Sequence, residues 1–192
     1  MLTLFKSLVL PILEYCSQLW SPCTIGVIRQ LEAVQRSFTY KIDGMRDLNY
    51  WERLRELGLY SLERRRDRYA IIYVWKIVNS MVPNISEGED RIKTQNHIRR
   101  GTLCVVPRLS GRALRSVQTM REHSLAVLGP RLFNELGPEL REYKGKLEGF
   151  KCRLDRFLNA VHDKPALPHY VQSACGNSLL DQLAQQRAER AR

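Results

Sequence analysis

The sequence predicts a mainly α fold, with two small helical modules and at most a short β-hairpin between them. Three observations support this prediction. Apolar residues recur at helical spacing through most of the chain, residues that cap or stop helices stand at the ends of these stretches, and only one short run is rich in β-branched residues. With 192 residues, 44% of them hydrophobic, the chain can bury a core in one domain or in two small ones.

The first module is predicted over residues 1–82 and begins with two helical segments. The strongly apolar stretch Leu2–Leu19 contains Pro11, which either kinks one helix or begins a second helix in its first turn. An amphipathic helix is predicted over Ile25–Ile42, because its apolar residues recur every three or four positions, and Gly44 ends it.

Two more helices complete the first module. Asn49 and Glu52 have the spacing of a capping box, which predicts a short helix that ends before Gly58. Ser61 is placed to cap a longer helix that reaches about Val82.

The rest of the chain is predicted as a connecting region over residues 83–112, a second helical module over 113–162 and an extended tail over 163–192. The connecting region is polar except for one β-branched run, and prolines mark the start of the tail. The predicted elements are a strand at Thr102–Val106, a helix from about Gln118, a helix at Lys146–Val161 and a weak helix at Ser178–Glu189.

The chain is strongly basic. Thirty-one Lys and Arg residues against 20 Asp and Glu residues give a net charge of +11 and an isoelectric point near 9.7. Such an excess favours phosphate backbones or anionic membrane surfaces as partners. The basic residues are spread along the chain with no detached basic tail, so a binding surface has to be assembled by folding.

Two groups of basic residues are candidates for contact with nucleic acid. The first, Arg64, Arg65, Arg68 and Lys76, belongs to the helix that starts at Ser61. Spacings of three and four place its arginines on one side of that helix, opposite an apolar side suited to a core. The alternative is a solvated helix face. The second group, which could equally be a basic loop, flanks the predicted strand and comprises Arg99, Arg100, Arg108 and Arg112.

Other residue types point away from catalysis and metal binding. The five cysteines are odd in number, widely spaced and without a CxxC pair, so we expect reduced thiols in an intracellular protein rather than disulfides or a zinc site. The four histidines stand apart, and the acidic residues nearest to a cluster, Glu87, Glu89 and Asp90, fall in a polar loop. We therefore expect no metal, no cofactor and no enzymatic activity. Most aromatic residues occupy apolar helical positions, which favours core packing over base stacking.

The N-terminal segment does not have the features of a signal peptide. Met1–Leu13 is apolar but lacks a basic start and a small-residue cleavage site. No stretch of the sequence approaches the roughly 18 apolar residues that a membrane-spanning helix needs.

Five stretches, in order, resemble the C-terminal region of the reverse transcriptases of non-LTR (LINE-type) retrotransposons. Characteristic marks include Leu-Glu-Tyr and Trp-Ser-Pro in the first stretch, Leu-Gly-Leu-x-Ser-Leu-Glu before an Arg-rich helix in the second, and Phe-Lys-x-x-Leu-Asp in the last. No single motif is decisive, but their order and spacing are similar to the family's over nearly the whole chain. The stretches are Leu4–Pro22, Leu31–Arg68, Arg99–Arg108, Leu132–Glu142 and Leu147–Leu158.

The resemblance implies a thumb-like first module, which holds a template–primer duplex, followed by a segment that binds template RNA. It also implies that the polymerase palm, with its catalytic aspartates, would lie upstream of Met1; this sequence has no Asp-Asp pair. We therefore expect a non-catalytic fragment that binds RNA or an RNA–DNA duplex without reading its sequence. The alternative is a helical protein-interaction module, or a leftover reading frame without a nucleic-acid role. The apolar segment Leu2–Leu13 would pack on the palm or mediate self-association.

Overall fold

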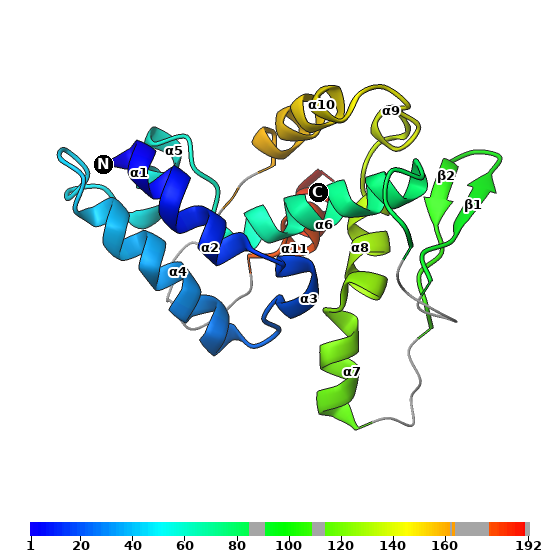
Figure 1. The fold of residues 1–192 in the computed structure, drawn as a ribbon, viewed down its shortest axis with the longest axis horizontal. Helices are drawn as coiled ribbons and strands as arrows, with labels where there is room; N and C mark the ends of the chain where they lie inside the picture. The colour runs from blue at the N-terminus through cyan, green and yellow to red at the C-terminus, as the bar shows by residue number, and fades with distance from the viewer. Residues whose placement is uncertain (85–90, 109–113, 162, 164–176, 191–192) are drawn as a thin grey trace. The chain divides into compact units, whose positions relative to one another are not determined.

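The computed structural model describes residues 1–84, 91–108, 114–161, 163 and 177–190 (Figure 1). The fold is mainly α, with one two-stranded antiparallel hairpin in the described part of the chain, which confirms the predicted fold class. The chain forms two compact units: unit 1 is Met1–Arg66 with Asp163–Arg192, and unit 2 is Asp67–His162. This division differs from the predicted one, because the boundary lies inside a helix and the end of the chain belongs to unit 1.

The N-terminal segment is helical without a break from α1 (Leu2–Leu4) through a π-helical turn (Phe5–Val9) to α2 (Leu10–Glu14). Pro11 lies in the first turn of α2, directly after the π-helical turn, and does not begin a separate helix. Proline lacks an N–H group and its ring collides with the carbonyl four residues earlier, so the wider π turn before Pro11 accommodates it. The short helix α3 (Ser17–Trp20) follows.

Helices α4 (Ile25–Tyr40) and α5 (Tyr50–Glu56) agree closely with the predicted helices. The Asn49 side chain accepts hydrogen bonds from the N–H groups of Trp51 and Glu52, while the Glu52 carboxylate accepts from the N–H of Asn49. This reciprocal pair is the predicted capping box. Gly58 follows the helix in the left-handed region, with φ +57°, which a residue with a Cβ adopts only at a cost.

Helix α6 (Leu62–Val78) begins where the sequence predicts and ends four residues early. The Ser61 hydroxyl accepts from the N–H of Arg64 and caps its start. At its end the N–H groups of Ser80 and Met81 donate to the carbonyls of Ile77 and Lys76. These are the two bonds of a Schellman motif, with Ser80 in the left-handed position, so local geometry ends the helix before Pro83.

The remaining elements of unit 2 start with β1 (Thr94–His97), which pairs antiparallel with β2 (Gly101–Cys104) and was not predicted. Its residues are polar and exposed, so they carry no alternating pattern. The helix predicted from Gln118 is divided in two, because the Ser124 hydroxyl donates to the carbonyl of Arg121 and the chain restarts there. The helices of unit 2 beyond the hairpin are α7 (Arg115–Glu122), α8 (Leu125–Asn134), α9 (Pro138–Arg141) and α10 (Leu147–Asn159).

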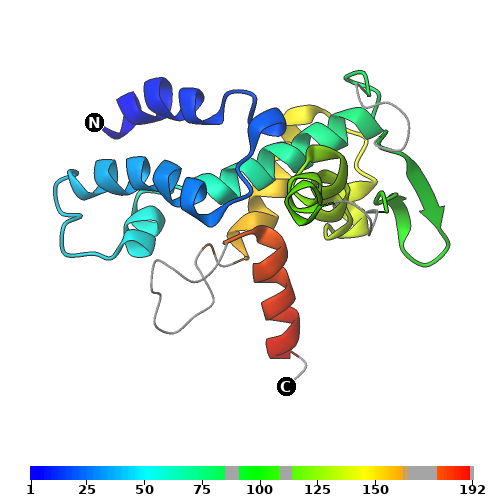
Figure 2. The same cartoon turned by 90° about the horizontal axis from the view of Figure 1, so that it is seen from below.

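Each unit has its own hydrophobic core. In unit 1, Phe5 and Leu10 of the N-terminal helices pack with Leu62, and the Phe5 and Phe38 rings stack with centroids 4.1 Å apart. Helices α1–α2 and α4 therefore lie side by side, as Figures 1 and 2 both show. In unit 2, the fully buried Trp75 stacks on Phe150 at 4.4 Å.

The end of the chain forms α11 (Leu179–Arg190), close to the predicted weak helix. Just before it, the N–H of Asn177 donates to the Glu63 carboxylate, and the Asn177 amide donates to Asp163. Asp163 also accepts hydrogen bonds from the N–H and hydroxyl groups of Ser61. These bonds tie the described part of the tail to the start of α6, within unit 1. The prolines taken as the mark of an extended tail fall in residues 164–176, outside the described residues.

Candidate nucleic-acid interface

The arginines of α6 do not form the solvent-facing side that the sequence predicts. Arg64 is fully buried, with a relative exposure of 0%, and Arg66 is also buried. No residue of α6 is exposed: each is buried or half-buried. The physical reason is that neighbours cover the polar side of α6 as well as its apolar side, which a helical periodicity alone cannot show.

The other two arginines of the cluster are engaged with acids of their own units. In unit 1, Arg65 forms an ion pair with Glu14 at the end of α2. In unit 2, Arg68 donates two hydrogen bonds to the carboxylate of Asp155 in α10, from Nε at 2.5 Å and from Nη2 at 2.8 Å. This two-pronged geometry is the one with which arginine binds carboxylates most strongly. Lys76, the fourth predicted residue, is half-buried in the last turn of α6. A phosphate would have to displace protein partners to reach Arg65 or Arg68.

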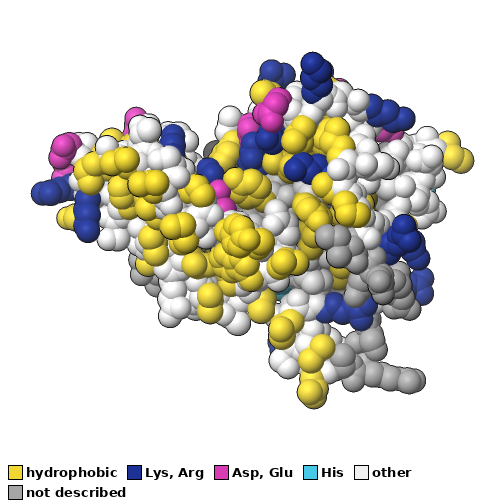
Figure 3. All heavy atoms as spheres, in the orientation of Figure 1, with side chains coloured by type: hydrophobic (Ala, Val, Ile, Leu, Met, Phe, Trp, Pro, Cys, Tyr) yellow, Lys and Arg dark blue, Asp and Glu magenta, His cyan; other side chains and the backbone are white. Residues whose placement is uncertain are grey.

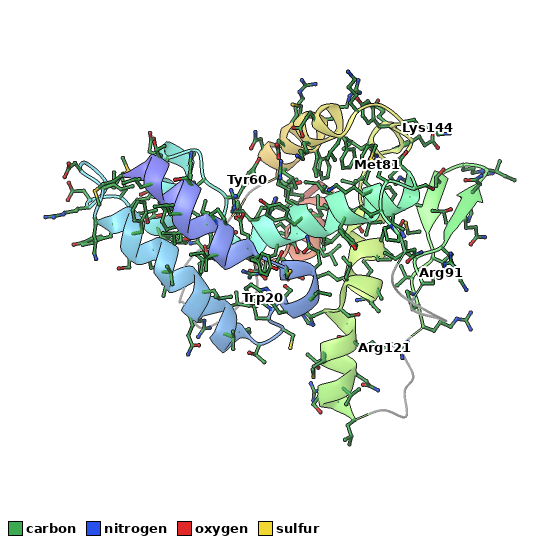
Figure 4. All side chains as sticks on the ribbon, viewed as in Figure 1. Trp20, Tyr60, Met81, Arg91, Arg121 and Lys144 are labelled. Carbon is green, nitrogen blue, oxygen red and sulfur yellow. The ribbon has the colours of Figure 1, made fainter. Side chains whose placement is uncertain are left out.

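The hairpin of unit 2 is the better candidate. Arg99 and Arg100 lie in its turn and Arg108 follows β2, as predicted, and all three are exposed. Arg91 and Lys93 precede β1, and both are exposed as well; Figure 4 shows Arg91 beside the hairpin. The sequence reasoning missed these two, because without β1 they seemed to belong to a loop far from the strand. We call Arg91, Lys93, Arg99, Arg100 and Arg108 the hairpin basic cluster.

No acidic residue stands among the hairpin basic cluster along the chain, although the Glu142 carboxylate accepts a hydrogen bond from the N–H of Thr102 beside the turn. Residues 91–108 contain these five basic residues and no Asp or Glu. Figure 3 shows Lys and Arg side chains on the hairpin side of unit 2. Arg112, the last of the predicted residues, lies outside the described residues, as do Glu87, Glu89 and Asp90.

Hydrogen bonds from helices of unit 2 hold the hairpin in place. The Asn134 side chain at the end of α8 accepts from the N–H of Cys104 and donates to its carbonyl, both at 2.8 Å. At the other end of β2, Arg141 of α9 donates to the carbonyl of Arg100 at 2.6 Å. The hairpin is thus fixed at both ends of β2, and its exposed cations lie in the turn and in the segments that flank the two strands.

The guanidinium of Arg141, which donates to the carbonyl of Arg100, is in contact with the hairpin turn. Arg141 is buried, and burial lowers the pKa of its guanidinium; the nearby charge of Arg100 lowers it further, while Glu142 and Cys104 act in the opposite direction. Arginine nevertheless stays protonated.

Unit 1 contains a buried polar network that the sequence reasoning did not anticipate. Glu32 of α4 is buried, accepts a hydrogen bond from the Tyr50 hydroxyl and accepts the N–H of Leu62 with both carboxylate oxygens, at 3.1 and 3.2 Å. Burial raises the pKa of Glu32 to about 7, against the lowering effect of these bonds. The sequence does contain one indication of this network, because Glu32, Gln35 and Thr39 recur at helical spacing, and in the structure they share a buried side of α4.

This network serves the fold. Glu32 supplies an acceptor for the N–H of Leu62, the first free N–H of α6. The burial of Tyr50, together with the neighbouring Glu32 carboxylate, raises the pKa of the Tyr50 hydroxyl. The described residues contain no group of three or more His, Cys, Asp or Glu side chains that could hold a metal ion. Among these residues, no helix is both long and apolar enough to cross a bilayer.

Comparison of the chain with models of known families, with curated proteins and with solved structures finds no match.

Proposed function

We propose that this chain binds RNA or an RNA–DNA duplex through the phosphate backbone, without reading sequence and without catalysis of its own. The resemblance to the thumb and post-thumb region of non-LTR retrotransposon reverse transcriptases supports this function, and we propose that the chain derives from that family. We place the contact surface on the hairpin of unit 2 instead of on α6. The turn and second strand of this hairpin fall in the Arg99–Arg108 stretch of that resemblance.

The hairpin basic cluster is the observation that carries the proposal. Its five cations are exposed, no acidic residue interrupts them along residues 91–108, and α8 and α9 hold the hairpin that these residues flank. Exposed cations on a rigid support contact successive phosphates at a small entropic cost, whereas those on a free loop must first be ordered. Contacts of this kind position a nucleic acid but carry no base information.

The test is the salt dependence of binding by the full chain. The probes are a 20-nucleotide polyuridine RNA and a 20-base-pair RNA–DNA duplex, with binding followed by fluorescence anisotropy between 50 and 200 mM KCl. Each lost phosphate contact lowers the log–log slope by roughly 0.9 on a duplex and somewhat less on a single strand. The triple variant Arg99→Ala, Arg100→Ala, Arg108→Ala should therefore flatten the slope by about 2–3 and weaken binding to all sequences alike.

A matched control removes the same charge elsewhere. Lys41, Arg46 and Arg55 are exposed residues of unit 1, and their triple alanine variant also lowers the net charge by three. We expect its slope to stay close to that of the unchanged protein. Equal effects of the two triple variants would mean that only net charge matters, and an unaltered slope in the hairpin variant would refute the assignment. Circular dichroism checks that both variants fold.

A further inference from the structure

The N-terminal helix of unit 1 is apolar on both sides. Phe5 and Leu10 face the core and are buried, whereas Leu4, Leu8 and Ile12 on the other side are 63%, 61% and 75% exposed. A helix that is hydrophobic all round is normally covered on all sides, because water in contact with the outer apolar side is unfavourable. The exposed side of α1–α2 is therefore an apolar surface in contact with water, of the kind that a binding partner would cover.

The uncovered surface continues beyond this helix. Of the 19 exposed residues from Thr3 to Tyr40, a range that the structure describes completely, Lys6 alone is charged, although 27% of all residues in the chain are charged. Figure 3 shows hydrophobic side chains gathered over α1–α4. Loss of charge is the compositional mark of the centre of a protein interface. The large exposed apolar residues, here called the apolar face, are Leu4, Leu8, Ile12, Tyr15, Leu19, Trp20, Ile25, Val27, Val34 and Tyr40.

The apolar face is large enough for a stable interface. Its ten side chains are between 41% and 85% exposed. At roughly 100–150 Å² for a fully exposed large apolar side chain, they present on the order of 600–900 Å². That lies at or above the upper end for the largest apolar patch of a typical monomer, about 300–600 Å², and is close to the share of one partner in a standard protein interface, about 800 Å².

We propose that a second copy of this chain covers the apolar face, in a two-fold symmetric dimer. A two-fold dimer needs one self-complementary patch, and a nearly uncharged patch avoids the repulsion that two copies with a net charge of +11 experience elsewhere. Binding to an anionic membrane would instead call for several Lys and Arg residues flanking the apolar side, and Lys6 is the one charged residue among the exposed residues of 3–40. The dimer proposal is independent of the proposed nucleic-acid function, which rests on unit 2.

Sedimentation equilibrium of the full chain from about 1 to 100 μM tests this proposal. The chain has a mass of 22.4 kDa, so the unchanged protein should approach twice that mass and level off there. The double variant Leu8→Glu, Ile12→Glu places charges in the interface on both copies and should raise the dimer dissociation constant at least about 30-fold. Because Leu8 and Ile12 are both exposed, the double variant should fold as the unchanged protein does, and circular dichroism checks this.

Leu114 provides the matched control, because it is an apolar residue of unit 2 with the same 75% exposure as Ile12. Leu114→Glu should dimerise as the unchanged protein does. The proposal fails if the unchanged protein is monomeric at 100 μM, if its mass rises beyond two copies without levelling off, or if Leu8→Glu, Ile12→Glu leaves dimerisation unaltered. It also fails if the monomer co-sediments with phosphatidylserine vesicles through the apolar face, since the cover is then a membrane.

Discussion

Replacing Glu32 with Gln should change how the stability of the chain depends on pH. In the folded chain the pKa of Glu32 is raised from its ordinary value of 4.5 to about 7, chiefly by burial. The folded state therefore keeps this proton between pH 4.5 and 7, whereas the unfolded state has released it. Because the folded state binds more protons in this range, the contribution of Glu32 to the free energy of unfolding falls as the pH rises.

The size of the effect follows from the shift in pKa. A shift of one pH unit corresponds to about 1.4 kcal/mol, so a rise from 4.5 to about 7 corresponds to roughly 3 kcal/mol. The Glu32 contribution is complete below pH 4.5, falls through the interval and levels off above about pH 7. Gln cannot ionise, yet its side-chain oxygen can still accept from Tyr50 and from the N–H of Leu62. The stability of Glu32→Gln relative to the unchanged protein should therefore rise by about 3 kcal/mol between pH 4.5 and pH 8.

Urea unfolding at pH 4.5, 5.5, 6.5, 7.5 and 8, followed by far-ultraviolet circular dichroism, measures this difference. Glu56→Gln, which neutralises an exposed carboxylate of α5, controls for the loss of a charge without burial. If the difference between Glu32→Gln and the unchanged protein stays constant over the whole range, the pKa of Glu32 is the same in the folded and unfolded states, and the reasoning from burial is wrong.

Two further predictions concern unit 2. The Arg68–Asp155 pair should contribute about 1 kcal/mol of coupling in a double-mutant cycle of Arg68→Ala and Asp155→Ala, since both its bonds are charge-assisted but partly exposed; purely additive effects would contradict a structural role for the pair. Gly101→Ala should cost about 1–2 kcal/mol, because Gly101 has φ +68° and a Cβ there would lie 2.0 Å from the Glu142 carboxylate. Hydrogen exchange of the hairpin amides measures that loss, and adding Glu142→Ala should restore only the part due to crowding; unchanged protection in Gly101→Ala would show that the turn tolerates a Cβ.

Local patterns in the sequence were enough to predict the fold class and most helices. The capping box of Asn49 and Glu52, the Ser61 cap and the glycine after α5 all act over a few residues, so their effect can be read without knowing the rest of the chain. The strand β1 was missed for the complementary reason: its polar residues become a strand only by pairing with β2.

The tertiary structure alone decided which basic residues can meet a phosphate. Periodicity places Arg64 opposite an apolar side of α6, but burial depends on whatever packs on the other side, and Arg64 is fully buried. Arg68 likewise meets Asp155 across 87 residues of sequence. In contrast, Arg99 and Arg100 remain exposed, because they lie in the turn of a two-stranded hairpin. The charge of a residue and the tendency of a segment to form a helix follow from the local sequence. The exposure of a side chain is set by contacts between residues far apart in the chain.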